Sequence, residues 1–302
     1  YSIMKYRVEK HNEFIQKHNI IGIESFDCNG IKITRNSVMD IIYLSNWQKL
    51  NHSHRLKSII WMFEILVEEY ELNDYLKALL FIPKKGFETA FANYDKEEKV
   101  IFLNPNYIET NSLFIIWNLF HEIRHAIQYK NQDLISQGYI PMDDFYRSFR
   151  YYFTYDGTTY LFNNDEEFQY KIKQDKDFCI ELYLRNPMEM DANKFAYKEM
   201  ENIIRKNIGI FGDDNISLMD LEKNKQIFFP NFKLITDDIE EYIIKLCQAL
   251  AELAYQNSVG IIDNHIFRQK EMEIYWAINQ VLEENNKAKL SFDLEELLLV
   301  GN

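Results

Sequence analysis

Apolar side chains recur at helical spacing through much of the chain. The clearest segment runs from Leu56 to Tyr70, where one face carries Leu56, Ile59, Ile60, Phe63, Leu66, Val67 and Tyr70. This spacing is typical of a helix that packs on a core, and residues 1–80 as a whole are predicted to be mostly helical. Amphipathic stretches predict three further helices, near residues 187–206, 237–256 and 266–285.

Two places show the pattern of strands instead. Residues 87–94 alternate enough for a strand, residues 99–103 form an apolar run, and the polar residues 95–98 between them predict a turn. The second place is residues 150–162, where β-prone runs flank Asp156-Gly157, a strong hairpin signal. The helix that follows the first hairpin is predicted to begin near Asn111 or Ser112, because either side chain can cap it.

Composition places the chain among globular proteins. Of its 302 residues 47% are hydrophobic, while Gly and Pro number only 9 and 5, so no flexible tract divides it. We expect an α+β protein with a small, mostly antiparallel sheet, a central motif helix and a largely helical C-terminal part. Three segments are predicted: a helical region over 1–80, a catalytic core over 81–200 and a helical subdomain over 201–302.

Net charge and cysteine content narrow the partners and the compartment. The 34 Lys and Arg against 47 Asp and Glu give a net charge of -13, which repels nucleic acid and anionic membranes and favours a neutral or basic polypeptide partner. No apolar run is long enough to span a membrane. The cysteines are odd in number and far apart (Cys28, Cys179 and Cys247), so we expect free thiols in the cytoplasm. Secretion is the alternative if a signal sequence preceded Tyr1.

His121, Glu122 and His125 form the pattern His-Glu-x-x-His. A helical turn holds about 3.6 residues, so the two imidazoles share a face and reach one metal ion. Glu122 lies beside them, where it can accept the proton of a metal-bound water that attacks a peptide carbonyl. Residues 113–127 are otherwise apolar on nearly every side, and buried imidazoles need partners. The pattern indicates a zinc protease; a satisfied pair of core histidines is the alternative.

A catalytic zinc needs a third protein ligand. In one class of zinc proteases the third ligand is a histidine on an extended motif, which would stand at position 131 in this chain. That position holds Asn131, so this class of protease is excluded. Glu189 is the best candidate, because it is predicted in the first turn of a helix beginning near Asn186-Pro187, on a face where alanines allow a close helix crossing. In the alternative, Glu189 only completes a capping box with Asn186. Other carboxylates compete for the role: Glu166, Glu167, Glu181 and Asp191.

A protease also needs a donor for the oxyanion that forms on the attacked carbonyl, typically a Tyr or His near the metal. The candidates are Tyr155, Tyr160 and His265. Each of them also has a structural explanation, so the choice among them stays open.

Two stretches together, His121-Glu122-x-x-His125-Ala126-x-Gln128 and Pro187-x-Glu189-x-Asp191-Ala192-Asn193-x-Phe195-Ala196, resemble the gluzincin branch of zinc metallopeptidases, in particular its compact, minigluzincin-like members. The resemblance covers about residues 87–196. It implies a zincin-like fold in which His121, His125 and Glu189 bind Zn²⁺ and Glu122 is the general base.

The same resemblance implies that an edge strand, within residues 87–94 or 100–103, pairs with the substrate backbone. The chain departs from the family pattern in two ways. The interval between His125 and Glu189 is long for a compact member, and Asn193 stands where some relatives carry an aspartate that orients a histidine ligand.

The sequence therefore predicts a zinc-dependent endopeptidase. One rival is a non-catalytic binding module that zinc stabilises; it is disfavoured because structural zinc sites prefer cysteine ligands and no cysteine lies near the motif. A second rival is a protein-interaction domain that binds no metal.

Overall fold

The computed structural model describes residues 3–42, 44–82, 91–141, 187–211, 215–229 and 260–285, together with the single positions 246, 249, 253, 256 and 257. The chain forms two compact units, Tyr1–Asn131 with Met190–Pro230, and Gln132–Glu189 with Asn231–Asn302. These units divide the chain at other positions than the three segments predicted from the sequence, whose boundaries stay a prediction.

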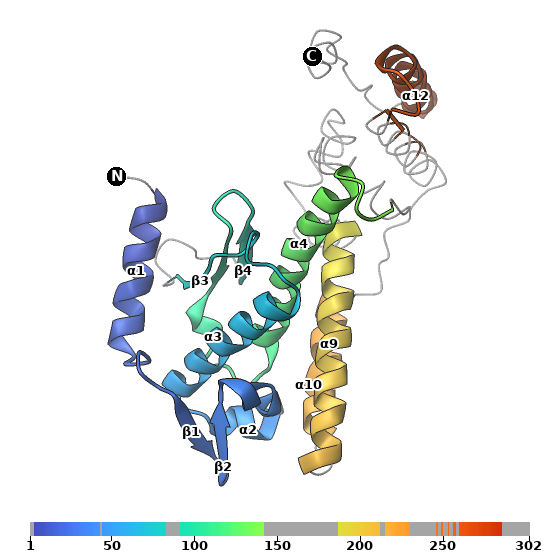
Figure 1. Ribbon diagram of the computed structural model, residues 1–302. Helices are drawn as coiled ribbons and strands as arrows, with labels where there is room; N and C mark the ends of the chain where they lie inside the picture. Colours follow the sequence, from blue (N-terminus) through green and yellow to red (C-terminus); the bar gives the residue numbers. More distant parts are fainter. Residues whose placement is uncertain are drawn as a thin grey trace. The chain divides into compact units, whose positions relative to one another are not determined.

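The described part is α+β and mostly helical, as predicted (Figure 1). Its α-helices are α1 (Ile3–Lys17), α2 (Leu44–Lys49), α3 (His52–Glu69), α4 (Phe114–Ser136), α9 (Pro187–Phe211), α10 (Asn215–Phe228) and α12 (Asn264–Glu284). Short 3-10 helices cover Arg35–Ile41 and Pro105–Tyr107. Helices α3, α9 and α12 confirm three of the predicted helices. The fourth, near residues 237–256, and the hairpin predicted at 150–162 lie largely or wholly outside the described residues.

The strands of the described part form two sheets, one antiparallel and one mixed, rather than one mostly antiparallel sheet. Strands β1 (Ser25–Cys28) and β2 (Ile31–Thr34) pair antiparallel. In the second sheet the order is β3-β5-β4, with β3 (Ala78–Phe81) parallel and β4 (Ala92–Asp95) antiparallel to β5 (Val100–Leu103). The second sheet is therefore mixed. The prediction missed β1, β2 and β3 because short strands within a mostly helical region give little periodic signal.

The hairpin predicted before the motif helix is confirmed as β4 and β5; residues 87–90 of its predicted first strand lie outside the described residues. Asp95 closes its turn by accepting hydrogen bonds at Oδ1 from the backbone N–H groups of Glu97 and Glu98, each 3.0 Å long. Lys99 completes the turn in the left-handed region, with φ 57°. Because β5 pairs on both sides, β4 rather than β5 is an edge of this sheet.

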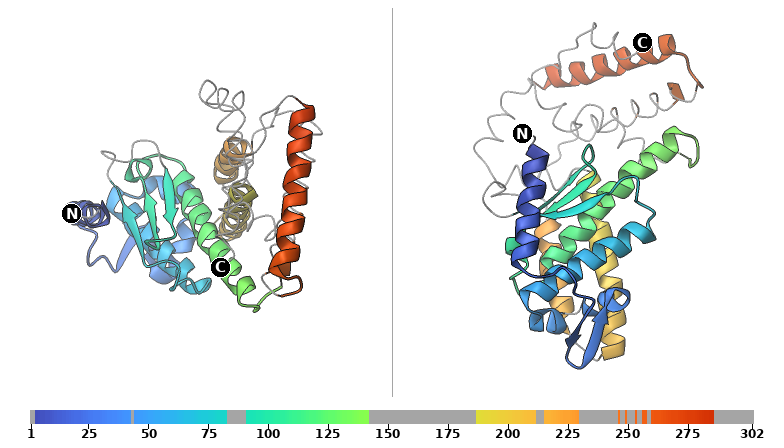
Figure 2. Two further views of the ribbon diagram at one scale, coloured as in Figure 1. Left: turned by 90° about the horizontal axis from the view of Figure 1, so that it is seen from above. Right: turned by 60° about the vertical axis from the view of Figure 1, so that its left-hand side comes forward.

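The two faces of the mixed sheet pack on different elements. Leu79, Phe81, Ile101 and Leu103 join the main core with α3 and α4, and the alternate residues Leu80, Ile82, Val100 and Phe102 form a second cluster that Met4 of α1 covers. Period-two alternation sends successive side chains to opposite faces, so both faces are covered and all four residues of β5 are buried. Figure 2 shows the sheet between α1 and α4.

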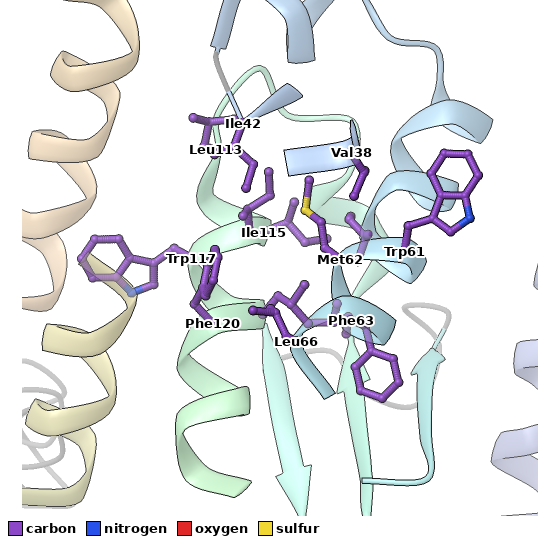
Figure 3. Packing of buried hydrophobic residues seen from close by; sticks show 14 of the residues in the cluster. Val38, Ile42, Trp61, Met62, Phe63, Leu66, Leu113, Ile115, Trp117 and Phe120 are labelled. Atoms are coloured by element: carbon purple, nitrogen blue, oxygen red, sulfur yellow. The ribbon is translucent and has the colours of Figure 1, made fainter. Parts of the chain in front are cut away.

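Helix α4 is buried at the centre of the main core. Its Ile115 and Phe120 point toward Met62 and Leu66 of α3 (Figure 3), and all four side chains are at most 2% exposed. Trp117, on another side of α4, stacks on Phe228 of α10 with ring centroids 5.0 Å apart. Apolar contact on several sides explains the nearly continuous apolar run that surrounds the motif in the sequence.

The start of α4 is fixed by polar contacts. The N–H of Leu113 donates to Oδ2 of Asp220 on α10 at 2.9 Å, and the N–H of Phe114 donates to Oγ of Ser112 at 3.2 Å. A carboxylate at a helix N-terminus satisfies N–H groups that have no partner within the helix and interacts favourably with its dipole. These contacts fix the helix that carries His121, Glu122 and His125.

Candidate metal centre

His121, Glu122 and His125 converge on one point. Each offers a nitrogen or carboxylate oxygen within 4.8 Å of the others, and all three residues are less than 9% exposed. Across the described ranges, no other three His, Cys, Asp or Glu side chains meet in this way. The helical spacing of the motif thus brings together the side chains that the sequence predicts.

Asn193 of α9 fixes the tautomer of His121. Its Oδ1 lies 2.7 Å from Nδ1 of His121 and accepts a second hydrogen bond, 3.2 Å long, from the indole N–H of Trp117. An indole nitrogen only donates, so the Asn193 atom at this position is the oxygen. Nδ1 of His121 therefore carries the proton, and its Nε2 holds the lone pair.

Gln128 fixes the tautomer of His125 in the same way. Its Oε1 lies 2.8 Å from Nδ1 of His125, while its Nε2 donates to Oδ2 of Asp191 at 2.7 Å. A carboxylate only accepts, so the amide nitrogen faces Asp191 and the amide oxygen faces the histidine. Nδ1 of His125 is the donor, and Nε2 again holds the lone pair.

The two Nε2 atoms lie 3.0 Å apart. Two lone pairs that face each other at this distance repel unless they share a cation. Two nitrogens on a tetrahedral zinc, each about 2.0–2.1 Å from the metal, lie about 3.3 Å apart, which is close to the observed separation. The donor set therefore fits a metal ion of the zinc type; a shared proton is the other cation that fits.

Glu122 lies beside this point without blocking it. Its Oε1 is 4.0 Å from Nε2 of His121, and its side chain is buried. A carboxylate at this distance leaves room for a ligand atom between itself and a metal. At this distance the carboxylate can act either as a ligand of a metal ion or as a base beside a water bound to it.

Asp191 forms hydrogen bonds with Arg124 and Gln128. It accepts from Arg124 Nε at 2.8 Å and Nη2 at 3.4 Å, in addition to the contact with Gln128. Arg124 also lies over the ring of Phe195, 5.1 Å from its centroid. Asp191 is not part of the converging group, and its contacts join α9 to α4.

Glu189 lies in the first turn of α9, which begins at Pro187 as predicted. It is one helical turn before Asn193, on the same face of the helix, and its Oε2 is shielded from solvent. Glu189 is not one of the three converging groups. Its expected capping partner Asn186, and the competing ligands Glu166, Glu167 and Glu181, lie outside the described residues.

The oxyanion donors named above stay predictions. Tyr155 and Tyr160 lie outside the described residues, and His265 is exposed in the first turn of α12. At the start of α3, Asn51 caps the helix through the N–H of His54, and the His54 ring stacks on Phe26 with centroids 4.2 Å apart.

Sequence reasoning missed the roles of Gln128, Trp117 and Arg124. The signal for Gln128 was its place three residues after His125, one turn along the same helix face. The contact of Asp191 with α4 has no comparable signal, because it depends on how α9 crosses α4.

Comparison with known protein families, curated proteins and solved structures finds no match for this chain. No helix among the described residues is long and apolar enough to cross a membrane.

Proposed function

We propose that this protein is a zinc-dependent metallopeptidase. The observation that carries the proposal is the convergence of two lone pairs, on Nε2 of His121 and of His125, beside the buried carboxylate of Glu122. Both histidines are held in the metal-binding tautomer by side chains that are themselves fixed. Such support of ligand histidines is usual at metal sites.

Each side chain has one role in this proposal. His121 and His125 hold the zinc, and Glu189 is the third ligand. A zinc ion held by these ligands would supply the Lewis-acid chemistry that makes a water acidic near neutral pH. Glu122 accepts the proton of that water and returns it to the leaving nitrogen. The position of Glu189 on α9, one turn from the residue that contacts His121, supports its assignment.

A substrate peptide would pair with β4. An extended peptide adds to a free sheet edge through backbone hydrogen bonds, and β5, the alternative substrate strand, already pairs on both sides. The net charge of -13 favours neutral or basic segments. The resemblance to gluzincins supports a zincin-like core, and the free thiol of Cys28 supports action in the cytoplasm.

A zinc-stabilised binding module is the rival to exclude. Structural zinc sites prefer cysteine and four protein ligands. Cys28, the cysteine within the described residues, is buried in β1 with its thiol 3.7 Å from the carbonyl oxygen of Asn46. In our proposal Glu122 acts as the base beside the metal rather than as a ligand, which distinguishes a catalytic site from a closed structural one.

The test uses a variant that lacks the proposed base, Glu122, but keeps the proposed metal ligands. Glu122→Gln preserves the shape of the side chain but cannot accept the proton, so peptide hydrolysis should be lost while zinc content and thermal stability stay near those of the wild type. Cleavage is mapped by mass spectrometry on proteome-derived peptides with both proteins. Hydrolysis by the variant within about tenfold of wild type would remove Glu122 as the base.

A further inference from the structure

We propose that Asp191 is a positioning residue for the metal ligand His125 and that it acts through Gln128. This inference rests on the metal site of the proposed function. The three side chains form a chain of two hydrogen bonds, 2.7 Å from Gln128 Nε2 to Asp191 Oδ2 and 2.8 Å between Gln128 Oε1 and His125 Nδ1. Asp191 lies on α9, whereas the other two lie on α4.

The direction of the Gln128 amide decides the tautomer of His125. An amide presents oxygen on one side and an NH₂ group on the other, at nearly equal size. If the amide turned over, its NH₂ group would face Nδ1, which would then accept, and the proton would move to Nε2. A histidine protonated on Nε2 has no lone pair for the metal on that side.

Asp191 prevents this reversal because a carboxylate accepts hydrogen bonds and donates none. A turned amide would place its oxygen 2.7 Å from a carboxylate oxygen, in a pocket where Gln128 is fully buried. His121 has its own amide, Asn193, whose direction Trp117 fixes instead. Each histidine is thus oriented by a neutral amide that a third side chain holds in one direction.

Arg124 provides the control for this assignment. It donates to the same Oδ2 of Asp191 at 2.8 Å and so offers a different reason for Asp191 to matter, as an ion pair that joins α4 to α9. The pair is about one quarter exposed, where such pairs contribute little. Arg124→Met removes the ion pair and keeps the length that packs on Phe195, while the contact between Gln128 and Asp191 remains.

The experiment measures two quantities on the full chain. The first is the tautomer of His125 in metal-free protein, from the ¹⁵N shifts of its ring nitrogens above the ordinary histidine pKa of about 6.5. The second is the zinc dissociation constant from chelator competition. In Asp191→Ala we expect the proton of His125 to distribute between both nitrogens and zinc to bind about 10–100-fold more weakly. Arg124→Met should stay within about threefold of wild type in zinc affinity.

Combining Asp191→Ala with a Gln128→Met variant separates an effect through this chain of hydrogen bonds from a general effect on folding. Gln128→Met removes the amide, so it should weaken zinc binding by itself, and adding Asp191→Ala to it should change zinc affinity no further. This comparison also tests whether Asp191 acts through Gln128 if Asp191→Ala alone folds poorly. Additive losses in the double variant would overturn the proposal, as would equal losses in Arg124→Met and Asp191→Ala, or a His125 tautomer unchanged in Asp191→Ala.

These results are distinguishable from failure of the proposed function. A wild-type protein that binds no zinc contradicts the metallopeptidase, whatever the tautomers. A wild-type protein that binds zinc with an affinity independent of Asp191 leaves the metallopeptidase standing and removes Asp191 as a positioning residue.

Discussion

Nδ1 of His121 on α4 lies 2.7 Å from Oδ1 of Asn193 on α9. The contact is buried, with Asn193 only 1% exposed, and it joins two residues that lie 72 positions apart in the sequence. It sets the direction of the lone pair that His121 presents to a metal. Asn193 was counted from the sequence as a departure from the gluzincin pattern, in which some members carry an aspartate at this position, and its Oδ1 contacts the His121 ring.

Replacement of Asn193 should separate its orienting role from its packing role. Asn193→Ala leaves the ring N–H of His121 and the indole N–H of Trp117 without their acceptor, so zinc affinity should fall about 10–100-fold and stability by about 1–3 kcal/mol. Asn193→Asp restores an acceptor for both and should bind zinc at least as tightly as wild type. Chelator competition and thermal melts measure both variants. Equal zinc affinity in Asn193→Ala and wild type would show that this contact does not serve the metal.

Glu189 is the assignment that most needs a direct test. If it is the third ligand, Glu189→Gln should weaken zinc binding by about a hundredfold or more, because losing a ligand costs more than losing a supporting contact. If Glu189 only caps α9, its loss should cost about 1 kcal/mol of stability and leave zinc affinity intact.

The matched controls for Glu189 are the same change at Glu166, Glu167 and Glu181, which should leave zinc affinity near wild type. A collapse in one of these three, with normal affinity in Glu189→Gln, would move the third ligand to that residue and contradict the gluzincin assignment.

Stability should fall as the pH drops through the range where buried histidines gain protons. Burial lowers the pKa of His11, whose Nδ1 accepts a 2.8 Å hydrogen bond from the backbone N–H of Phe81. Burial likewise lowers the pKa values of His18 and His52, whose rings lie 4.4 Å apart. A lowered folded pKa means that the fold prefers the neutral ring, so this stabilisation is present above the unfolded value of about 6.5 and is lost as the pH falls below it.

Thermal melts across this pH range test that expectation. His11→Asn offers a matched variant, because the Asn oxygen can take the place of Nδ1 as acceptor but does not titrate. We expect the variant to lose stability less steeply below about pH 6.5 than the wild type. Identical pH dependence in both proteins would show that the contact between α1 and β3 does not respond to protons.

The sequence predicted those parts of the fold that repeat a period over several turns. Helix α3 was found from apolar spacing and the motif helix α4 from an apolar run around the His-Glu-x-x-His pattern. The β4–β5 hairpin was found from an alternating run and an apolar run around a polar turn. Strand β3 was missed because it is short and buried on both faces, so its four residues show no alternation. Its parallel pairing with β5 depends on contacts between distant residues.

The candidate site likewise has one part that the sequence predicts and one part that depends on long-range packing. His121, Glu122 and His125 share one helix, so their spacing alone predicts that they meet. The supporting contacts of Asn193 and Asp191 join α9 to α4, and the crossing of two helices is a property of the packed core. The sequence could indicate which residues hold a metal but not what holds those residues.

The zinc content of the purified protein tests the central claim most directly. Wild-type protein, purified without chelator and reloaded with zinc, should retain about one equivalent after desalting, whereas His125→Ala should retain almost none, because two remaining ligands bind weakly. Metal analysis by mass spectrometry gives both values, and circular dichroism confirms that the variant is folded. A wild-type protein that retains no zinc, or a His125→Ala variant that retains a full equivalent, would contradict a metal site at His121 and His125.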